Sequence, residues 1–428
     1  GYTPTGAQNA PSPASGRGLE CDKLSREAVE FHFNSFIKKL IDDVGPLAGK
    51  SFVATHIDSW EVGEQNWTPR MREEFMKRRG YDLLPFLPAL IGLAVESREV
   101  SERFLWDFRR TISELLLENY AERMRELANR YGLRLSIEGY ATSLTDQFAY
   151  GGQADEPMGE FWSWPKYGAS SSCTEMSSAG HTHGKRVIGA EAFTADAGER
   201  WLGYPGNIKD LADWAFCEGI NRFVVHRYAL QPWLDVKPGM SMGPWGLHYE
   251  RTQTWWEQSR AWHDYLARCQ YLLQQGLFVA DICLLVPEGA PQSLGGQAIL
   301  PKLTSPGRPF ERPGYNFDFC SSDVIYKMKV KDGKIYLPDG MSYWVLVLPR
   351  SPRMTPKLLR KIGELIKEGA TVIGAPPLSS PSLEDYPKCD EEISILRREI
   401  WGGDITPRKL TTRKYGKGKI FWGGYFSL

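Results

Sequence analysis

The chain has 428 residues, with 52 lysines and arginines against 52 aspartates and glutamates, so its formal net charge is zero. This balance argues against a general nucleic-acid binder, which needs a basic excess, and against a polybasic surface for anionic membranes. Hydrophobic residues make up 42% of the chain and charged residues 24%, as in folded globular proteins. Fifteen tryptophans exceed what the core needs, and aromatic side chains often hold flat, partly apolar ligands.

Short apolar runs alternate with long amphipathic runs from residue 24 onward. The periodicity predicts helices over residues 24–44, 100–131 and 255–275, with Ser101 as the N-cap of the second helix and Gly132 as its end. Strands are predicted at residues 51–58, 133–139, 159–164, 186–193 and 221–228. Because helical runs separate the strands, we expect parallel pairing and an α/β fold.

The sequence changes character after residue 276. Apolar strands are predicted at residues 281–287, 342–349 and 369–377, with an amphipathic helix at 356–369. This pattern predicts a small parallel sheet with helices on both faces, in the flavodoxin-like style. The proline- and glycine-rich residues 292–313 are expected to form a loop. No apolar stretch reaches the 18 residues that a membrane span needs.

Carboxylates accompany the first four predicted strands. In a (β/α) barrel the reacting groups lie at the carboxyl ends of the strands. Glu61 follows the first strand, Glu138 lies near the end of the second, Glu160 lies in the third and Glu191 lies near the end of the fourth. A buried carboxylate is costly unless it is paired, ligated or used, so four of them at one edge predict a functional site. The other candidate site residues are Asp58, Trp60, Trp162, His226 and Tyr228.

Two kinds of chemistry need several carboxylates. Glycoside hydrolysis uses one as the acid and one as the base or nucleophile, and a hard cation such as calcium needs several oxygen ligands. Simpler alternatives remain, because Glu61 can be a solvated loop residue and Glu138 can pair with an arginine or a backbone donor. His181 and His183 have the spacing of metal ligands on a strand, but without a third ligand we expect them at a helix end or on the surface.

Several blocks of sequence carry a resemblance to a known family. They include THIDSWEVGEQNWT (55–68), PMGEFW (157–162), GAEAFT (189–194), DWAFCEGINRFVVHRYALQPW (213–233) and MGPWGLHYERTQTWWEQ (242–258). Together they resemble the α-L-rhamnosidases of glycoside hydrolase family 106. The similarity runs from Gly1 to about Pro287 and continues more weakly beyond it.

The resemblance implies a (β/α)₈ barrel, hydrolysis of terminal α-L-rhamnosyl linkages with inversion, and calcium as a cofactor. It implies that Glu61, after barrel strand four, is the general acid and that Glu191, after strand seven, is the general base. Glu160 matches a further active-site carboxylate, and we assign Asp58 and Glu160 as the candidate calcium ligands.

The same resemblance implies how the chain is organised and where it works. Residues 1–276 are expected to hold strands four to eight of the barrel, as a partial TIM barrel, with three strands before Gly1. Residues 277–428 are expected to form a flavodoxin-like accessory domain of the glutamine-amidotransferase type. The chain would then be an internal fragment of a periplasmic or secreted bacterial protein whose partner is a rhamnose-containing glycan or glycoside.

Two other functions stay open. A different barrel glycosidase, such as a β-galactosidase-like enzyme, also uses acids after strands four and seven. A non-catalytic carbohydrate-binding protein, or an inactive fragment, would use the same aromatic residues without hydrolysis. A nucleotide or flavin is not expected, because no GxGxxG or phosphate loop follows the strand at 281–287.

Overall fold

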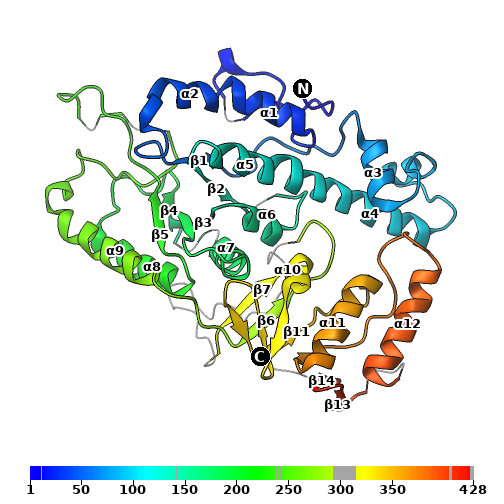
Figure 1. Ribbon diagram of the computed structural model, residues 1–428. Coiled ribbons are helices and arrows are strands. Elements are labelled where there is room, and N and C mark those ends of the chain that lie inside the picture. The colour runs from blue at the N-terminus through cyan, green and yellow to red at the C-terminus, as the bar shows by residue number, and fades with distance from the viewer. Residues whose placement is uncertain are drawn as a thin grey trace.

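The structure is a computed structural model of the chain, shown in Figure 1. It describes residues 1–424 except positions 11, 141, 167, 169, 238, 241–242, 293–314 and 404–406. The loop predicted at residues 292–313 therefore lies almost wholly outside the described residues. Among the residues described, no helix is long and apolar enough to cross a membrane.

The first sheet has five parallel strands that stand side by side in chain order. They are β1 (Ala54–Ile57), β2 (Arg134–Glu138), β3 (Glu156–Trp164), β4 (Gly189–Ala195) and β5 (Arg222–Val225). All five were predicted, and the sheet is curled as half of a (β/α) barrel would be (Figure 1). Parallel neighbours in chain order are the pattern of successive barrel units, so the α/β class is confirmed and a partial barrel is consistent with the structure.

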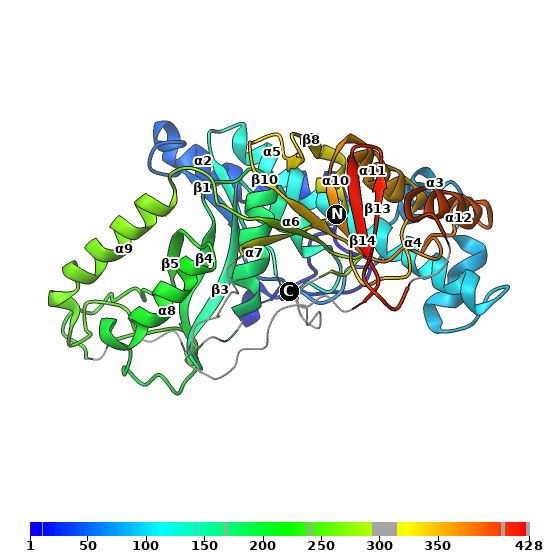
Figure 2. The same cartoon turned by 90° about the horizontal axis from the view of Figure 1, so that it is seen from below.

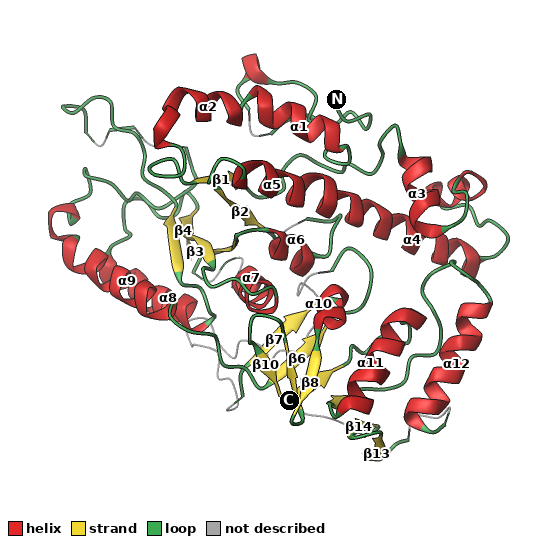
Figure 3. Ribbon diagram, viewed as in Figure 1, coloured by secondary structure: helices red, strands yellow, loops and turns green. Residues whose placement is uncertain are grey.

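Helices lie around this sheet, some packed on its strands and others on neighbouring helices (Figure 3). They are α1 (Arg26–Ser35), α2 (Ile37–Val44), α3 (Met71–Arg79), α4 (Arg98–Leu116), α5 (Arg123–Asn129), α6 (Gln147–Gln153), α7 (Ser170–Thr182), α8 (Pro205–Cys217) and α9 (Arg260–Leu273). Short 3₁₀ turns lie at residues 14–16, 45–47, 84–91 and 256–258, and a π-helical turn at 117–122 joins α4 to α5.

Two predicted helices differ in detail from those observed. The helix predicted at residues 24–44 breaks at Phe36, whose backbone leaves the helical region (φ −126°, ψ −71°). The predicted N-cap Ser101 is wrong, because α4 begins earlier and the side chain of Ser97 accepts the Val100 N–H at 3.1 Å. The Ser101 hydroxyl instead contacts Val95 of the preceding loop. Both serines can bond a backbone group, so the apolar periodicity alone did not distinguish them.

The second sheet has six strands, in the order β13-β14-β12-β11-β6-β7. They are β6 (Ile282–Leu285), β7 (Phe317–Cys320), β11 (Val345–Val347), β12 (Thr371–Ile373), β13 (Thr411–Tyr415) and β14 (Gly418–Trp422). All neighbours are parallel except β13 and β14. The five parallel strands stand side by side in the order β7, β6, β11, β12, β14. If they are numbered along the chain, this order is 2-1-3-4-5, which is the order of flavodoxin-like sheets.

Three helices and a small antiparallel sheet complete this part of the chain. They are α10 (Ser322–Lys327), α11 (Pro356–Glu368), α12 (Lys388–Trp401), and the strands β8 (Lys329–Lys331), β9 (Lys334–Tyr336) and β10 (Ser342–Tyr343). Helix α11 begins where predicted, with Thr355 as its cap and Pro356 in its first turn. The division of the chain into residues 1–276 and 277–428 stays a prediction.

Helix α7 lies between the two sheets and packs on both β3 and β7 (Figure 2). His181, in its last turn, places Nδ1 2.8 Å from Asp318 Oδ1 and stacks on Phe278 with ring centroids 4.2 Å apart. His183, just after the helix, places Nε2 3.1 Å from Asp323 Oδ2. Both histidines were expected at a helix end or on the surface. They lie at the helix end, where His181 is buried and His183 partly buried, and they link the end of α7 to β7 and to the helix at Ser322–Lys327.

Candidate active site

The carboxyl edge of the first sheet gathers the predicted acids. Glu160 on β3 and Glu191 on β4 are direct register partners across the two strands. Ile57, at the end of β1, pairs with Ile137, so Asp58 and Glu138 follow at neighbouring positions of the same edge. Because the strands are parallel, their carboxyl ends meet on one side of the sheet, as in barrel active sites.

Glu138 is the most deeply buried acid of this group. Its side chain is 2% exposed, and Tyr140 Oη donates a hydrogen bond to its Oε2 at 2.9 Å. Asp58 and Glu191 lie beside Glu138, close enough for their charges to act on its carboxyl. Burial, together with the neighbouring charges of Glu191 and Asp58, raises the pKa of Glu138 to about 10. Glu138 is therefore a neutral acid at pH 7 and can donate its proton to an adjacent carboxylate.

Glu191 lies beside this neutral acid. Burial raises the pKa of Glu191, and the Thr194 hydroxyl, which donates a hydrogen bond to Oε1, opposes that rise. His226 Nδ1 lies 3.4 Å from the same oxygen. Burial and the charge of Arg227 lower the pKa of His226 to about 4, so its imidazole is neutral near pH 7. Glu191 is thus a half-buried carboxyl whose own surroundings tune its proton affinity, as a general base requires.

Asp58 belongs to a small group of potential cation ligands. One ligand atom from each of His56, Asp58 and Glu138 lies within 4.8 Å of the others. His56 Nε2 is 3.6 Å from Asp58 Oδ1, and this contact holds the pKa of Asp58 below its usual range. The Asp58 carboxylate fits a hard cation such as calcium, whereas a protonated Glu138 and an imidazole are not typical calcium ligands. Glu160 is not part of this group, so its assignment as a ligand stays a prediction.

Glu160 is held by aromatic neighbours. Trp162 Nε1 donates a hydrogen bond of 2.7 Å to Glu160 Oε1, and Tyr140 also bonds to the Glu160 side chain. Burial raises the pKa of Glu160. Tyr140 thus lies between Glu138 and Glu160, and Glu138 is the centre of the group, with Asp58 and Glu191 as its other neighbours.

Glu61 lies beside the network, on the loop that follows β1. It is exposed, and the Ser59 hydroxyl donates a hydrogen bond of 3.2 Å to its Oε1. Glu61 and Trp60 line a cavity of about 230 Å³ that also includes Asp58. The wall behind Trp60 contains Lys23, whose Nζ lies 5.3 Å from the Trp60 ring centroid. A carboxyl at this open edge can exchange protons with a bound ligand and with solvent.

The structure places the remaining predicted residues in two groups. Trp162 and His226 contact the acids directly, whereas Tyr228 is 55% exposed and meets the ring of Trp256 at 6.0 Å. The sequence analysis missed Thr194 and Lys23. Thr194 follows Glu191 by three residues and had no signal of its own, and Lys23 lies more than thirty residues before β1.

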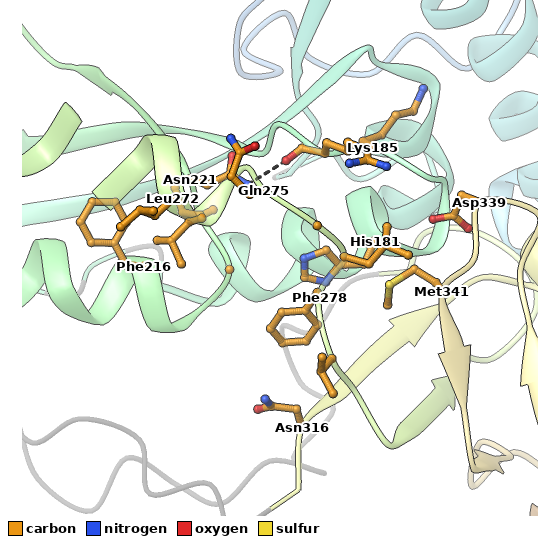
Figure 4. Close-up of a pocket in the computed structure, with 17 residues that line it drawn as sticks. His181, Lys185, Phe216, Asn221, Leu272, Gln275, Phe278, Asn316, Asp339 and Met341 are labelled. Atoms are coloured by element: carbon orange, nitrogen blue, oxygen red, sulfur yellow. Dashed lines mark hydrogen bonds between the residues drawn. The ribbon is translucent and has the colours of Figure 1, made fainter. Parts of the chain in front are cut away.

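A second cavity, of about 340 Å³, lies at the other end of the strands (Figure 4). It includes His181, Phe278 and Asn221, and Figure 4 shows these side chains between the start of the second sheet and the helices of the first. Asn221 accepts the Ile188 N–H and donates to the Arg186 carbonyl, each at 2.8 Å, so its amide serves the local backbone. Barrel active sites lie at the opposite, carboxyl edge.

Comparison with solved structures first defines the class of fold. A β-galactosidase from the haloarchaeon Halorubrum lacusprofundi matches 98% of this chain and 74% of its own with a TM-score of 0.56, at 11% identity. At that identity the likeness shows the fold alone, which is shared with barrel glycosidases. The family model for glycoside hydrolase family 106, described as α-L-rhamnosidase, matches residues 1–427. The chain belongs to this family, as its sequence blocks predicted.

Two relatives are more similar in sequence. A rhamnosidase from Novosphingobium sp. PP1Y superposes with a TM-score of 0.85 at 32% identity, over 97% of this chain and 39% of that one. A protein of Formosa agariphila named "Putative beta-glucuronidase" is 42% identical over 402 residues, which is 94% of this chain and 33% of that protein. The chain thus spans between a third and two-fifths of the length of these relatives.

Proposed function

We propose that the protein hydrolyses terminal α-L-rhamnosyl linkages with inversion of configuration. The observation that carries the proposal is the half-buried Glu191 at the carboxyl edge of the sheet, bonded to Thr194 and next to a neutral Glu138, in a chain of the α-L-rhamnosidase family. The 32% identity with a solved rhamnosidase supports the same substrate class.

Glu191 acts as the general base in this proposal. It must be ionised to take a proton from water, and like charges nearby would oppose that ionisation. Glu138 keeps its proton at neutral pH, so it adds no second negative charge beside Glu191 and can donate a hydrogen bond to it. The neutral His226 next to Glu191 adds no positive charge of its own to the carboxylate, which preserves its basicity.

Glu61 acts as the general acid. Its place on the open side of the site allows it to reach the glycosidic oxygen and to recover a proton from solvent after each turnover. Inversion needs room for a water between base and sugar, which requires roughly 6.5–9.5 Å between the two carboxyls in the working enzyme. Trp60, Trp162, His226 and Tyr228 are proposed to contact the sugar.

Calcium is proposed as the cofactor, with Asp58 and Glu160 as its candidate ligands, while the protonated Glu138 and His56 lie next to Asp58 without ligating the ion. When bound, such a cation attracts the hydroxyl oxygens of a sugar. The residues of this chain orient the substrate around that position. Trp162 is itself fixed by its bond to Glu160 and offers an apolar surface to the sugar ring.

A panel of 4-nitrophenyl glycosides tests the activity in the full-length protein. We expect hydrolysis of the α-L-rhamnoside, and nuclear magnetic resonance of the first-formed sugar should show the inverted anomer. Cleavage of the β-galactoside or β-glucuronide without the rhamnoside would contradict the proposed substrate. A retained anomer would contradict the roles of the two acids.

The variants Glu61→Gln and Glu191→Gln test the two residues, with Glu64→Gln as a matched control in the same loop. We expect losses of about a hundredfold or more in kcat for the first two and little change for the control. Binding of rhamnose that persists in Glu61→Gln, together with no turnover by the wild type, would instead support a non-catalytic carbohydrate-binding protein.

A further inference from the structure

Two exposed indoles lie on the loops that follow β4 and β5. Trp201 is 41% exposed and Trp245 is 54% exposed. Both loops leave the carboxyl edge that carries Glu160 and Glu191, so the indoles lie on the same side of the sheet as the acids. The surrounding contacts decide whether these rings are incidental surface residues or are held in place.

Trp245 is followed by a rigid anchor. The N–H of Gly246 donates to the carbonyl of Ala195 at 2.7 Å, and the N–H of Leu247 donates to the carbonyl of His226 at 2.8 Å. Leu247 is 1% exposed. Gly246 has φ +100°, and a β-carbon there would approach His226 Nδ1 to 3.2 Å, so the turn requires glycine. The anchor ties Trp245 to the ends of two strands of the site.

Trp245 also continues an aromatic surface that begins at the acids. Its ring meets the ring of Trp162 edge to face, with centroids 5.9 Å apart and planes at 76°. Trp162 in turn donates its indole N–H to Glu160. The path from Glu160 outward therefore consists of one indole bonded to the acid and a second indole that is more than half exposed.

Trp201 is held by a buried carboxylate. Its backbone has φ +62°, a left-handed conformation that a bulky residue adopts only when its surroundings impose it. Glu199 is fully buried. Its carboxylate accepts the N–H of Trp201 at 2.8 Å and the N–H of Gly203 at 2.9 Å. Glu199 Oε2 also lies 2.5 Å from His248 Nδ1. The imidazole of His248 stacks under the indole at 3.6 Å. These contacts hold Trp201 with one face of its indole against His248, while the residue stays 41% exposed.

The two loops pack on each other. Gly203 lies in the loop of Trp201, and Leu247 lies in the loop of Trp245. A β-carbon on Gly203 would lie only 2.1 Å from Leu247 Cδ1, so the two loops touch at a point where no larger side chain fits. Glycine at this contact lets the two indole-bearing loops form one unit. That unit adjoins the candidate active site through Trp162.

We propose that Trp201 and Trp245 form a second sugar-binding surface, which holds neutral sugar units of the substrate beyond the bond that is cleaved. Indole rings suit this ligand, because the apolar C–H face of a sugar ring stacks on them without needing charge. The substrate class is then an oligosaccharide or polysaccharide that ends in rhamnose, rather than a small glycoside. This inference rests on the proposed function of the same site.

Kinetics on two substrates test the proposal in the full-length protein. The substrates are methyl α-L-rhamnoside, whose aglycone has no ring to stack, and a neutral trisaccharide that ends in α-L-rhamnose. We expect Trp245→Ala and Trp201→Ala to lower kcat/KM on the trisaccharide about tenfold more than on the methyl glycoside. Trp245→Phe should restore much of the loss. Trp344→Ala is the matched control, because Trp344 is 49% exposed in the second part of the chain, beside Lys334.

Equal effects on the two substrates, including no effect on either, would overturn the proposal. If the wild type hydrolyses neither rhamnoside, the proposed function fails, and titration calorimetry with the trisaccharide decides the inference separately. Binding by the wild type that is lost in Trp245→Ala would then support the second sugar surface. Absence of binding, or binding that Trp245→Ala and Trp201→Ala leave unchanged, would overturn it. Circular dichroism of each variant shows whether it is folded.

Discussion

The neutral state of Glu138 has a direct consequence for stability. Its carboxyl is 2% exposed, with the charges of Asp58 and Glu191 beside it, and its pKa rises from 4.5 to about 10 in the folded protein. Between these values the folded state holds a proton that the unfolded state has released. Stability from this group is therefore complete at low pH and is lost as pH rises, by about 1.4 kcal/mol per pH unit.

Glu138→Gln removes this dependence and keeps the shape of the side chain. The glutamine amide is neutral at all pH values and can still donate to the neighbouring carboxylates. Between pH 5.5 and 7.5, the unfolding free energy of the variant relative to wild type should rise by about 2–3 kcal/mol. The measurement is the urea midpoint followed by tryptophan fluorescence, with a chelator present so that bound metal does not stabilise either protein.

Glu102→Gln serves as the control, since Glu102 lies exposed on α4 with a side chain 48% accessible to solvent. Its effect on the urea midpoint should be the same at both pH values. A flat difference between Glu138→Gln and wild type across this pH range would refute the reasoning. Glu138 would then be ionised in the folded protein, and the like-charge argument for Glu191 as the charged base would fail with it.

Three further predictions concern other contacts. Thr194→Val removes the hydrogen bond that lowers the pKa of Glu191. The acidic limb of the kcat/KM pH profile should then move up by about 0.5–1 pH unit. A limb that stays at the wild-type pH would contradict Glu191 as the base. Asp58→Asn should weaken calcium binding, measured by titration calorimetry, by about tenfold or more; equal affinity would place the ion elsewhere. Arg103 is 1% exposed and donates a hydrogen bond to Asp390 at 2.6 Å. Arg103→Met should therefore lower the free energy of unfolding, measured in urea, by about 2–4 kcal/mol. A change under about 0.5 kcal/mol would show that this contact contributes little.

The strands of the first sheet, and the gathering of acids at its carboxyl edge, could be predicted from the sequence. Its strands are short apolar runs between long amphipathic helices, and this pattern follows from burial on both faces of a parallel sheet. Because parallel strands place their carboxyl ends together, the positions of Glu138, Glu160 and Glu191 after or within such runs already indicated one edge. The blocks around these residues also identified the family correctly.

Only the tertiary structure decided how the acids differ from one another. Glu138 and Glu61 look alike in sequence, one at the end of a strand and the other just after one, yet Glu138 is buried beside two other acids and Glu61 lies exposed on a loop. Proton affinity depends on burial and on charges a few ångströms away, which come from other strands. Lys23 reaches the site through a contact with Trp60, which lies far from it in the sequence, whereas Thr194 bonds to Glu191 on the same strand and no sequence pattern marked that bond.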